Sequence, residues 1–90
     1  MDNVSLIIEN FNDWGKPWTF YKYVINNQQI SEEEKNEFLK IYKDASEFEV
    51  WNFSDLSEGA KNSTLYLKKN TQFTDEAIKR IVNAIAYEWK

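Results

Sequence analysis

Apolar side chains recur with helical spacing in three separate stretches of this chain, and this repeat constrains the fold more than any other feature of the sequence. Within residues 4–11, 38–45 and 78–89, apolar positions follow one another at intervals of three and four. Such spacing places them on one face of an α-helix. Each stretch therefore predicts a helix with one apolar side, and these sides must pack against one another.

Residues that favour helix ends mark further boundaries. Ser31 followed by Glu34 predicts a capping box, in which each side chain bonds to the backbone N–H of the other residue. Thr74 predicts the N-cap of the last helix. Gly15 and Pro17 predict a tight corner after a first helix over about residues 3–12. There Gly15 ends that helix in a left-handed conformation, and Pro17 begins the next helix.

Three segments lie between these helices. Residues 18–25 contain few polar positions and predict a buried helix, with a strand as the weaker alternative. Residues 54–69 predict another helix, although Gly59 inside it costs about 1 kcal/mol relative to alanine. Residues 46–53 alternate only in part, so a short strand and a helical turn both fit. If extended, that segment would be an edge able to pair with another chain.

Ninety residues, of which 42% are hydrophobic, fit a single folded domain spanning residues 1–90. The predicted fold is all-α: a compact bundle of four to five short helices, with one short extended segment near residues 48–53 as the open alternative. Its core is expected to be rich in aromatic rings. The residues assigned to that core are Phe20, Phe38, Tyr42, Ile81 and Ile85.

The composition excludes most catalytic sites. The chain has no histidine and no cysteine, which removes the commonest general base, metal ligand and thiol nucleophile. Its two glycines are isolated, so no phosphate-binding loop can form. Carboxylates alone could still make an enzyme, but the acidic run at residues 32–34 is more typical of a solvated helix start. We expect no enzymatic activity, no metal and no cofactor.

The chain also lacks the features of exported and membrane proteins. No apolar run approaches the roughly 20 residues that span a bilayer, and the N-terminus has no basic stretch that would begin a signal peptide. The absence of cysteine also favours a reducing compartment. We therefore expect a cytoplasmic protein with no membrane partner.

Charge is distributed unevenly along the sequence. Residues 31–60 contain nine acidic side chains and three lysines, whereas residues 61–90 contain six basic and three acidic side chains. An acidic field repels phosphate backbones and attracts basic proteins. This distribution disfavours direct nucleic-acid binding and favours a basic protein partner.

The acidic middle of the chain also contains aromatic rings, which are enriched in the centres of protein interfaces. Acids and rings alternate most closely between residues 44 and 55, and we assign the candidate partner-binding residues there and at the nearby Glu58. They are Asp44, Glu47, Glu49, Trp51, Phe53, Asp55 and Glu58. The plainer interpretation is an exposed edge whose acids only keep the protein soluble. The rings of Trp14, Trp51 and Phe53 fit a core and an interface about equally well.

Two stretches carry a resemblance to a known group of proteins. Residues 16–23 read Lys-Pro-Trp-Thr-Phe-Tyr-Lys-Tyr, and residues 84–90 read Ala-Ile-Ala-Tyr-Glu-Trp-Lys. With its size and acidity, the chain resembles small bacterial immunity proteins of contact-dependent and other polymorphic toxin systems. The resemblance implies a cytoplasmic inhibitor that binds one cognate toxin domain, often a basic nuclease, and covers its active site or an adjacent surface. The group has no diagnostic motif, so the resemblance assigns no binding residue.

Two other functions fit the same sequence. A phage-type inhibitor of a host defence protein would also be small and acidic, but the basic final third suits a nucleic-acid mimic poorly. A structural or homodimerising adaptor would instead use its aromatic surface for self-association.

Overall fold

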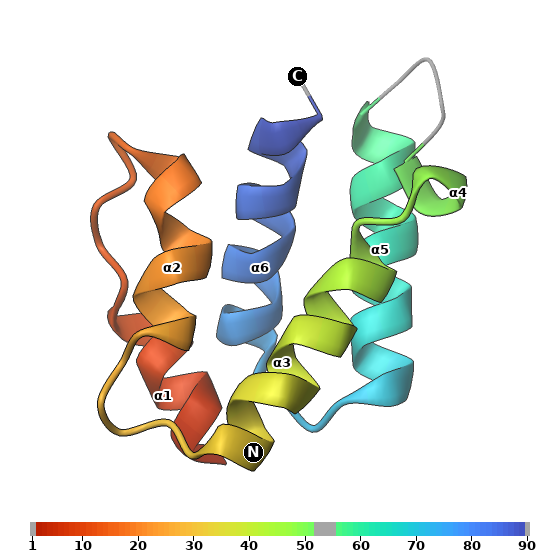
Figure 1. Cartoon of the computed structure of the whole chain (residues 1–90). Helices are drawn as coiled ribbons and strands as arrows, with labels where there is room; N and C mark the ends of the chain where they lie inside the picture. The colour runs from red at the N-terminus through yellow and green to blue at the C-terminus, as the bar shows by residue number, and fades with distance from the viewer. Residues whose placement is uncertain (1, 52–55, 90) are drawn as a thin grey trace.

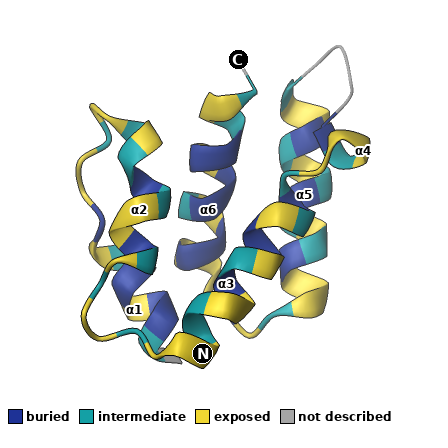
Figure 2. Cartoon of the chain, in the orientation of Figure 1, coloured by how far each residue is buried: buried dark blue, intermediate teal, exposed yellow. Residues whose placement is uncertain are grey.

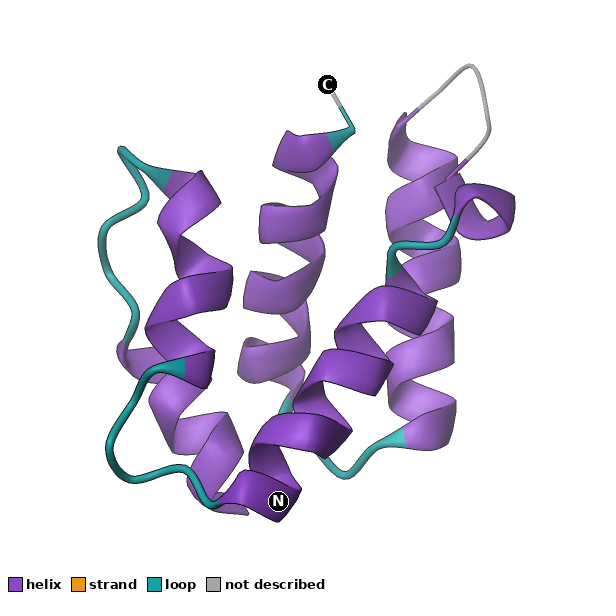
Figure 3. Ribbon diagram, in the orientation of Figure 1, coloured by secondary structure: helices purple, strands orange, loops and turns teal. Residues whose placement is uncertain are grey.

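The protein is a bundle of helices, as the sequence predicts. The computed structural model describes residues 2–51 and 56–89, and in this part of the chain all regular secondary structure is helical (Figure 3). The helices are α1 (Asp2–Asn10), η1 (Pro17–Thr19, a 3₁₀ turn), α2 (Phe20–Ile25), α3 (Glu32–Ala45), α4 (Phe48–Trp51), α5 (Leu56–Asn70) and α6 (Asp75–Glu88). No helix in the described part of the chain is long and apolar enough to cross a membrane.

Helix α6 lies in the middle of the bundle, with α1 and α2 on one side and α5 on the other (Figure 1). Its buried face runs from residue 77 to residue 85, and the end of the helix is more exposed (Figure 2). The residues of this face are Ala77, Ile78, Ile81, Val82, Ala84 and Ile85. All five predicted core residues are buried, including Phe20 and Phe38, which are fully inaccessible. The helical periodicity therefore located the centre of the core.

The predicted helix starts are confirmed. The Ser31 Oγ accepts a hydrogen bond from the Glu34 N–H at 3.1 Å, and the Ser31 N–H donates to Glu34 Oε1 at 2.9 Å. The bond from the Ser31 backbone also lowers the pKa of the Glu34 carboxyl. Thr74 caps α6 by accepting from the Ala77 N–H at 3.1 Å, and Pro17 is the first residue of η1.

The corner after α1 differs from the prediction. α1 ends at Asn10, and no residue of the described backbone, Gly15 included, has a positive φ. The prediction that Gly15 adopts a left-handed conformation was therefore wrong. The corner instead closes through a turn in which the Lys16 N–H donates to the Asp13 carbonyl at 2.9 Å, a geometry that any residue can adopt.

The helix predicted over residues 18–25 forms, but only part of it is buried. Phe20 and Val24, one turn apart, face the core, whereas Trp18 is 57% exposed and Tyr23 is 36% exposed. The correction has a geometric cause. A helix packed on one side of a bundle buries one stripe of residues, so a continuous apolar run must leave some rings outside.

For residues 46–53, the sequence left a strand and a helical turn open, and the described part contains a helical turn. Residues 48–51 form the single turn α4, which packs against α5, so the strand alternative does not apply to them. Phe53 and Asp55 lie outside the described residues.

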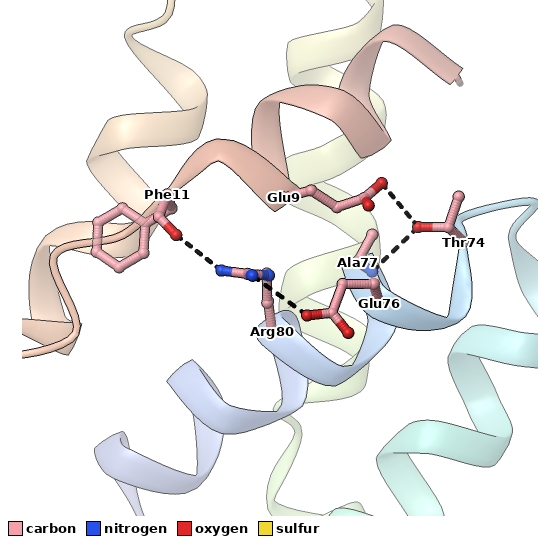
Figure 4. Close-up of polar contacts among 6 residues, drawn as sticks. All are labelled: Glu9, Phe11, Thr74, Glu76, Ala77 and Arg80. Carbon is pink, nitrogen blue, oxygen red and sulfur yellow. Dashed lines mark hydrogen bonds and ion pairs between the residues drawn. The ribbon is translucent and has the colours of Figure 1, made fainter.

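Polar contacts fasten α1 to α6 (Figure 4). The Arg80 Nη1 donates to the Phe11 carbonyl at 2.8 Å, just beyond the C-terminal end of α1, and Nη2 lies 3.2 Å from Glu76. A cation is favoured there because helix carbonyls lack partners at that end. The Thr74 hydroxyl, which caps α6, also donates to Glu9 of α1 at 3.0 Å.

Gly59 has a packing role that the sequence did not reveal. Trp51 packs so closely on α5 that a Cβ built on Gly59 would lie 2.4 Å from the ring carbon Cε3 and 2.8 Å from Cδ2. Only a residue without a Cβ fits this contact. Glycine lowers the stability of the helix relative to alanine, but it allows the Trp51 indole to be buried against α5.

Replacing Gly59 with alanine is expected to lower the free energy of unfolding by about 1–3 kcal/mol, because overlap with the Trp51 ring outweighs the gain in helix propensity. Urea denaturation measures this difference. Gly15→Ala is the matched control, since no atom lies within 4 Å of the position that its Cβ would take, and it should change stability little. A Gly59→Ala protein at least as stable as the parent would contradict the tight contact.

Candidate protein-binding surface

Five of the predicted partner-binding residues lie in the described part of the chain, and they fall into three groups. Glu47, Glu49 and Glu58 are exposed: Glu47 precedes α4, Glu49 lies in α4, and Glu58 is near the start of α5. Asp44 is half-buried and accepts a hydrogen bond from the Tyr66 hydroxyl at 3.0 Å, so its carboxylate is partly engaged within the protein. Trp51 lies in the core.

Trp51 must be corrected from a surface residue to a core residue. It is 2% exposed, and its indole Nε1 donates to the Ala45 carbonyl at 2.7 Å. The Ser63 hydroxyl donates to the same oxygen at 3.0 Å. This carbonyl belongs to the last turn of α3, where helix carbonyls lack partners along the helix. A buried acceptor and the space over Gly59 together explain why the ring turns inward.

Trp14, whose ring also fitted either role, is half-buried and packs against the core. Its ring meets Phe11 edge-on at 4.8 Å and stacks on Phe20 at 5.8 Å. It therefore belongs mainly to the aromatic core.

The C-terminal end of α6 connects three other elements. The ring of Tyr87 lies 5.9 Å from that of Trp18 in η1. The Glu88 carboxylate accepts a hydrogen bond of 2.6 Å from the Tyr42 hydroxyl of α3. Trp89 donates from Nε1 to the Ser46 carbonyl at 3.3 Å and lies 6.2 Å, ring to ring, from Phe48 of α4. Consecutive side chains thus join η1, α3 and α4 at one end of the bundle.

Two rings remain largely uncovered at this end. Phe48 is 60% exposed and Trp18 is 57% exposed, while Tyr87 between them is 38% exposed. In Figure 1, α4 and the C-terminus of α6 lie at the same end of the molecule, and Figure 2 shows exposed residues on both. We call this region the end surface. It consists of Trp18, Glu47, Phe48, Glu49, Tyr87, Glu88 and Trp89.

The exposure of Phe48 and Trp18 was not predicted: Phe48 lay within the candidate stretch but was not chosen as a site residue, and Trp18 was assigned to a buried helix. Phe48 stands between Glu47 and Glu49, and this flanking by two charges was the available signal that its position faces water. For Trp18 the signal was weaker. Its position does not continue the four-residue spacing of the buried residues Phe20 and Val24, but the surrounding run of rings obscured this.

Two tyrosines of the bundle have raised pKa values. Burial, reinforced by the hydrogen bond to Glu88, raises the pKa of Tyr42 well above its ordinary value of 10.0. Partial burial and the bond to Asp44 also raise the pKa of Tyr66. Both hydroxyls therefore act as donors that fix carboxylates, and neither is suited to be a base near neutral pH.

Two features of the described residues bear on metal binding and on small-molecule binding. Within residues 2–51 and 56–89, no group of three or more acidic side chains is placed to hold a metal ion. A hollow of about 350 Å³ lies away from the end surface, next to the α5–α6 turn, and Glu37 and Lys69 on its wall have opposite charges.

No family model, curated protein or solved structure matches this chain.

Replacing Tyr42 with phenylalanine is expected to cost about 1–2 kcal/mol of unfolding free energy, because it removes a short hydrogen bond to a carboxylate. Since the folded pKa of Tyr42 is raised, its contribution is present below pH 10 and falls as the pH rises above that value. Tyr66→Phe, which removes the longer bond to Asp44, is the control and should cost less. Thermal unfolding between pH 7 and pH 11 compares the three proteins; equal stability of the parent and Tyr42→Phe throughout would refute this role.

Proposed function

We propose that this protein is an immunity-type inhibitor that binds a basic toxin domain, such as a nuclease, and neutralises it in the cytoplasm. The observation that carries the proposal is the exposed ring of Phe48 between the exposed carboxylates of Glu47 and Glu49. The resemblance of the chain to small immunity proteins points to the same class of function.

Phe48 has the properties of an interface anchor. A single exposed apolar residue is common on protein surfaces and needs no explanation. Phe48, however, rests on Trp89, and Trp89 is in turn fixed to the Ser46 carbonyl. A supported ring loses little conformational freedom on binding, so burying it in a pocket of a partner is favourable.

The flanking acids specify the chemistry of the partner. A nuclease must have a positive surface to hold nucleic acid, and an acidic inhibitor is attracted to that surface from a distance. Glu47 and Glu49 would face the cations of the toxin while Phe48 occupies an apolar pocket beside them. Occupation of the cationic surface also excludes the nucleic-acid substrate.

The first test is genetic. The proposal expects a reading frame next to this gene to encode a toxin domain, whose expression stops growth unless this protein is made at the same time. Rescue by the parent protein, and loss of rescue with Phe48→Ala, would support it. If no neighbouring product is toxic, or if rescue does not occur, the proposed function is wrong.

Once the toxin domain is purified, Glu47→Lys combined with Glu49→Lys is expected to slow its association with this protein about tenfold. The double variant should also weaken the dependence of the association rate on salt. Phe48→Ala should mainly speed dissociation, with a loss of about 2 kcal/mol of binding free energy. Stopped-flow and surface-based kinetics separate the two effects.

Glu33→Lys combined with Glu37→Lys is the matched control. Both residues are exposed on α3 outside the end surface, and the change in net charge is the same. If this control slows association as much as the α4 variant does, net charge governs binding and α4 is not the contact.

A further inference from the structure

A hollow of about 300 Å³ lies between α5 and α6, which pack side by side (Figure 1). Helix α5 contributes Thr64 and Lys68 to its lining, and α6 contributes the remaining residues. No residue of the end surface lines it, so it is a separate feature of the molecule. Small-molecule sites have volumes from about 300 Å³ upward, so this hollow suits a ligand of modest size.

The most buried residues of the hollow are apolar. Ile78 and Val82 lie one turn apart on α6 and are only 2% and 6% exposed. The Thr64 hydroxyl donates to the Ala60 carbonyl at 2.8 Å, so its hydrogen is already used within α5. A ligand group that meets this part of the hollow should therefore be hydrocarbon, because a polar group buried without a partner is unfavourable.

The remaining lining supplies hydrogen-bond donors. Lys68, Lys79 and Asn83 line the hollow and are exposed. Within residues 2–51 and 56–89, no carboxylate pairs with either lysine, and no group bonds to the side-chain amide of Asn83. Two ammonium groups and one amide are therefore available to a ligand.

One acid offsets part of the positive charge. Asp75 also lines the hollow and is exposed, so the lining has two positive charges and one negative charge. Asp75 is the first residue of α6, where the positive end of the helix dipole attracts its carboxylate. The next acid, Glu76, does not line the hollow and is paired with Arg80 at 3.2 Å. The hollow thus keeps an excess of one positive charge, in a protein whose net charge is -4.

We propose that this hollow binds a small monocarboxylate with an apolar body, such as a medium-chain aliphatic acid. The hydrocarbon covers Ile78 and Val82, while the carboxylate accepts hydrogen bonds from the lysines and from Asn83. An inorganic anion would leave the apolar part uncovered, and a cation would be repelled by the excess positive charge. For a ligand of about ten non-hydrogen atoms, the dissociation constant should be on the order of 1 mM.

Titration of the full-length protein with octanoate, up to about 10 mM, tests the site through its backbone amide NMR shifts. Saturable shifts are expected at Thr64, Lys68, Ile78 and Val82, and not at Phe48 of the end surface. Octylamine has the same hydrocarbon chain with the opposite charge, and acetate has the carboxylate without the chain. Both should bind at least tenfold more weakly than octanoate.

Substitutions at the charged lining residues test the orientation of the ligand. Lys68→Gln combined with Lys79→Gln is expected to weaken octanoate binding about tenfold. Asp75→Asn should strengthen it about threefold, because it removes the acid that lines the hollow. Lys61→Gln combined with Lys69→Gln is the matched control. Both residues are exposed on α5 and neither lines this hollow, so the variant should bind as the parent does. Circular dichroism spectra establish that each variant is folded.

The inference is overturned if octanoate produces no saturable shift, or if octylamine or acetate binds as tightly as octanoate. It is also overturned if the variant at Lys68 and Lys79 binds like the parent, or if Asp75→Asn weakens binding. The site requires no toxin and shares no residue with the end surface. Failure of octanoate binding therefore leaves toxin rescue in cells untouched, and failure of rescue leaves the site untouched.

Discussion

Burial of the apolar face of α6 is the constraint on which the rest of the structure depends. This helix supplies six buried residues, and α1, η1 and α5 pack directly on it. Its start is fixed by Thr74 and by the bonds from Thr74 and Arg80 to α1, while its end meets η1, α3 and α4 through Tyr87, Glu88 and Trp89. One helix thus both centres the core and assembles the surface proposed to bind partners.

Features that depend on local sequence were predictable. The buried stripes of α1, α3 and α6 follow from helical spacing, and the caps at Ser31 and Thr74 follow from side chains that reach the backbone within three residues. The helices were therefore located to within a few residues. An all-α fold then followed, since these segments have no other means of covering their apolar sides.

Features that depend on distant residues were not predictable. The inward turn of Trp51 requires the Ala45 carbonyl and the space over Gly59, neither of which a single segment displays. The outward position of Trp18 depends on which side of α2 faces the bundle. Among the predicted site residues, Glu47, Glu49 and Glu58 are exposed, as expected because charges avoid burial. The exposure of the rings was harder to predict, because rings serve both cores and surfaces.

The contact between Trp51 and Gly59 separates two requirements within the short helix α4. A single turn of helix is not stable alone, so α4 exists only because Trp51 anchors it to α5. The side chains of Glu47 and Glu49 are exposed and take no part in that anchoring, and Phe48 is 60% exposed although one side of its ring rests on Trp89. Substitutions at the exposed positions could thus change the surface offered to a partner while the contact between Trp51 and Gly59 stays the same. Recognition can then diversify without loss of folding stability.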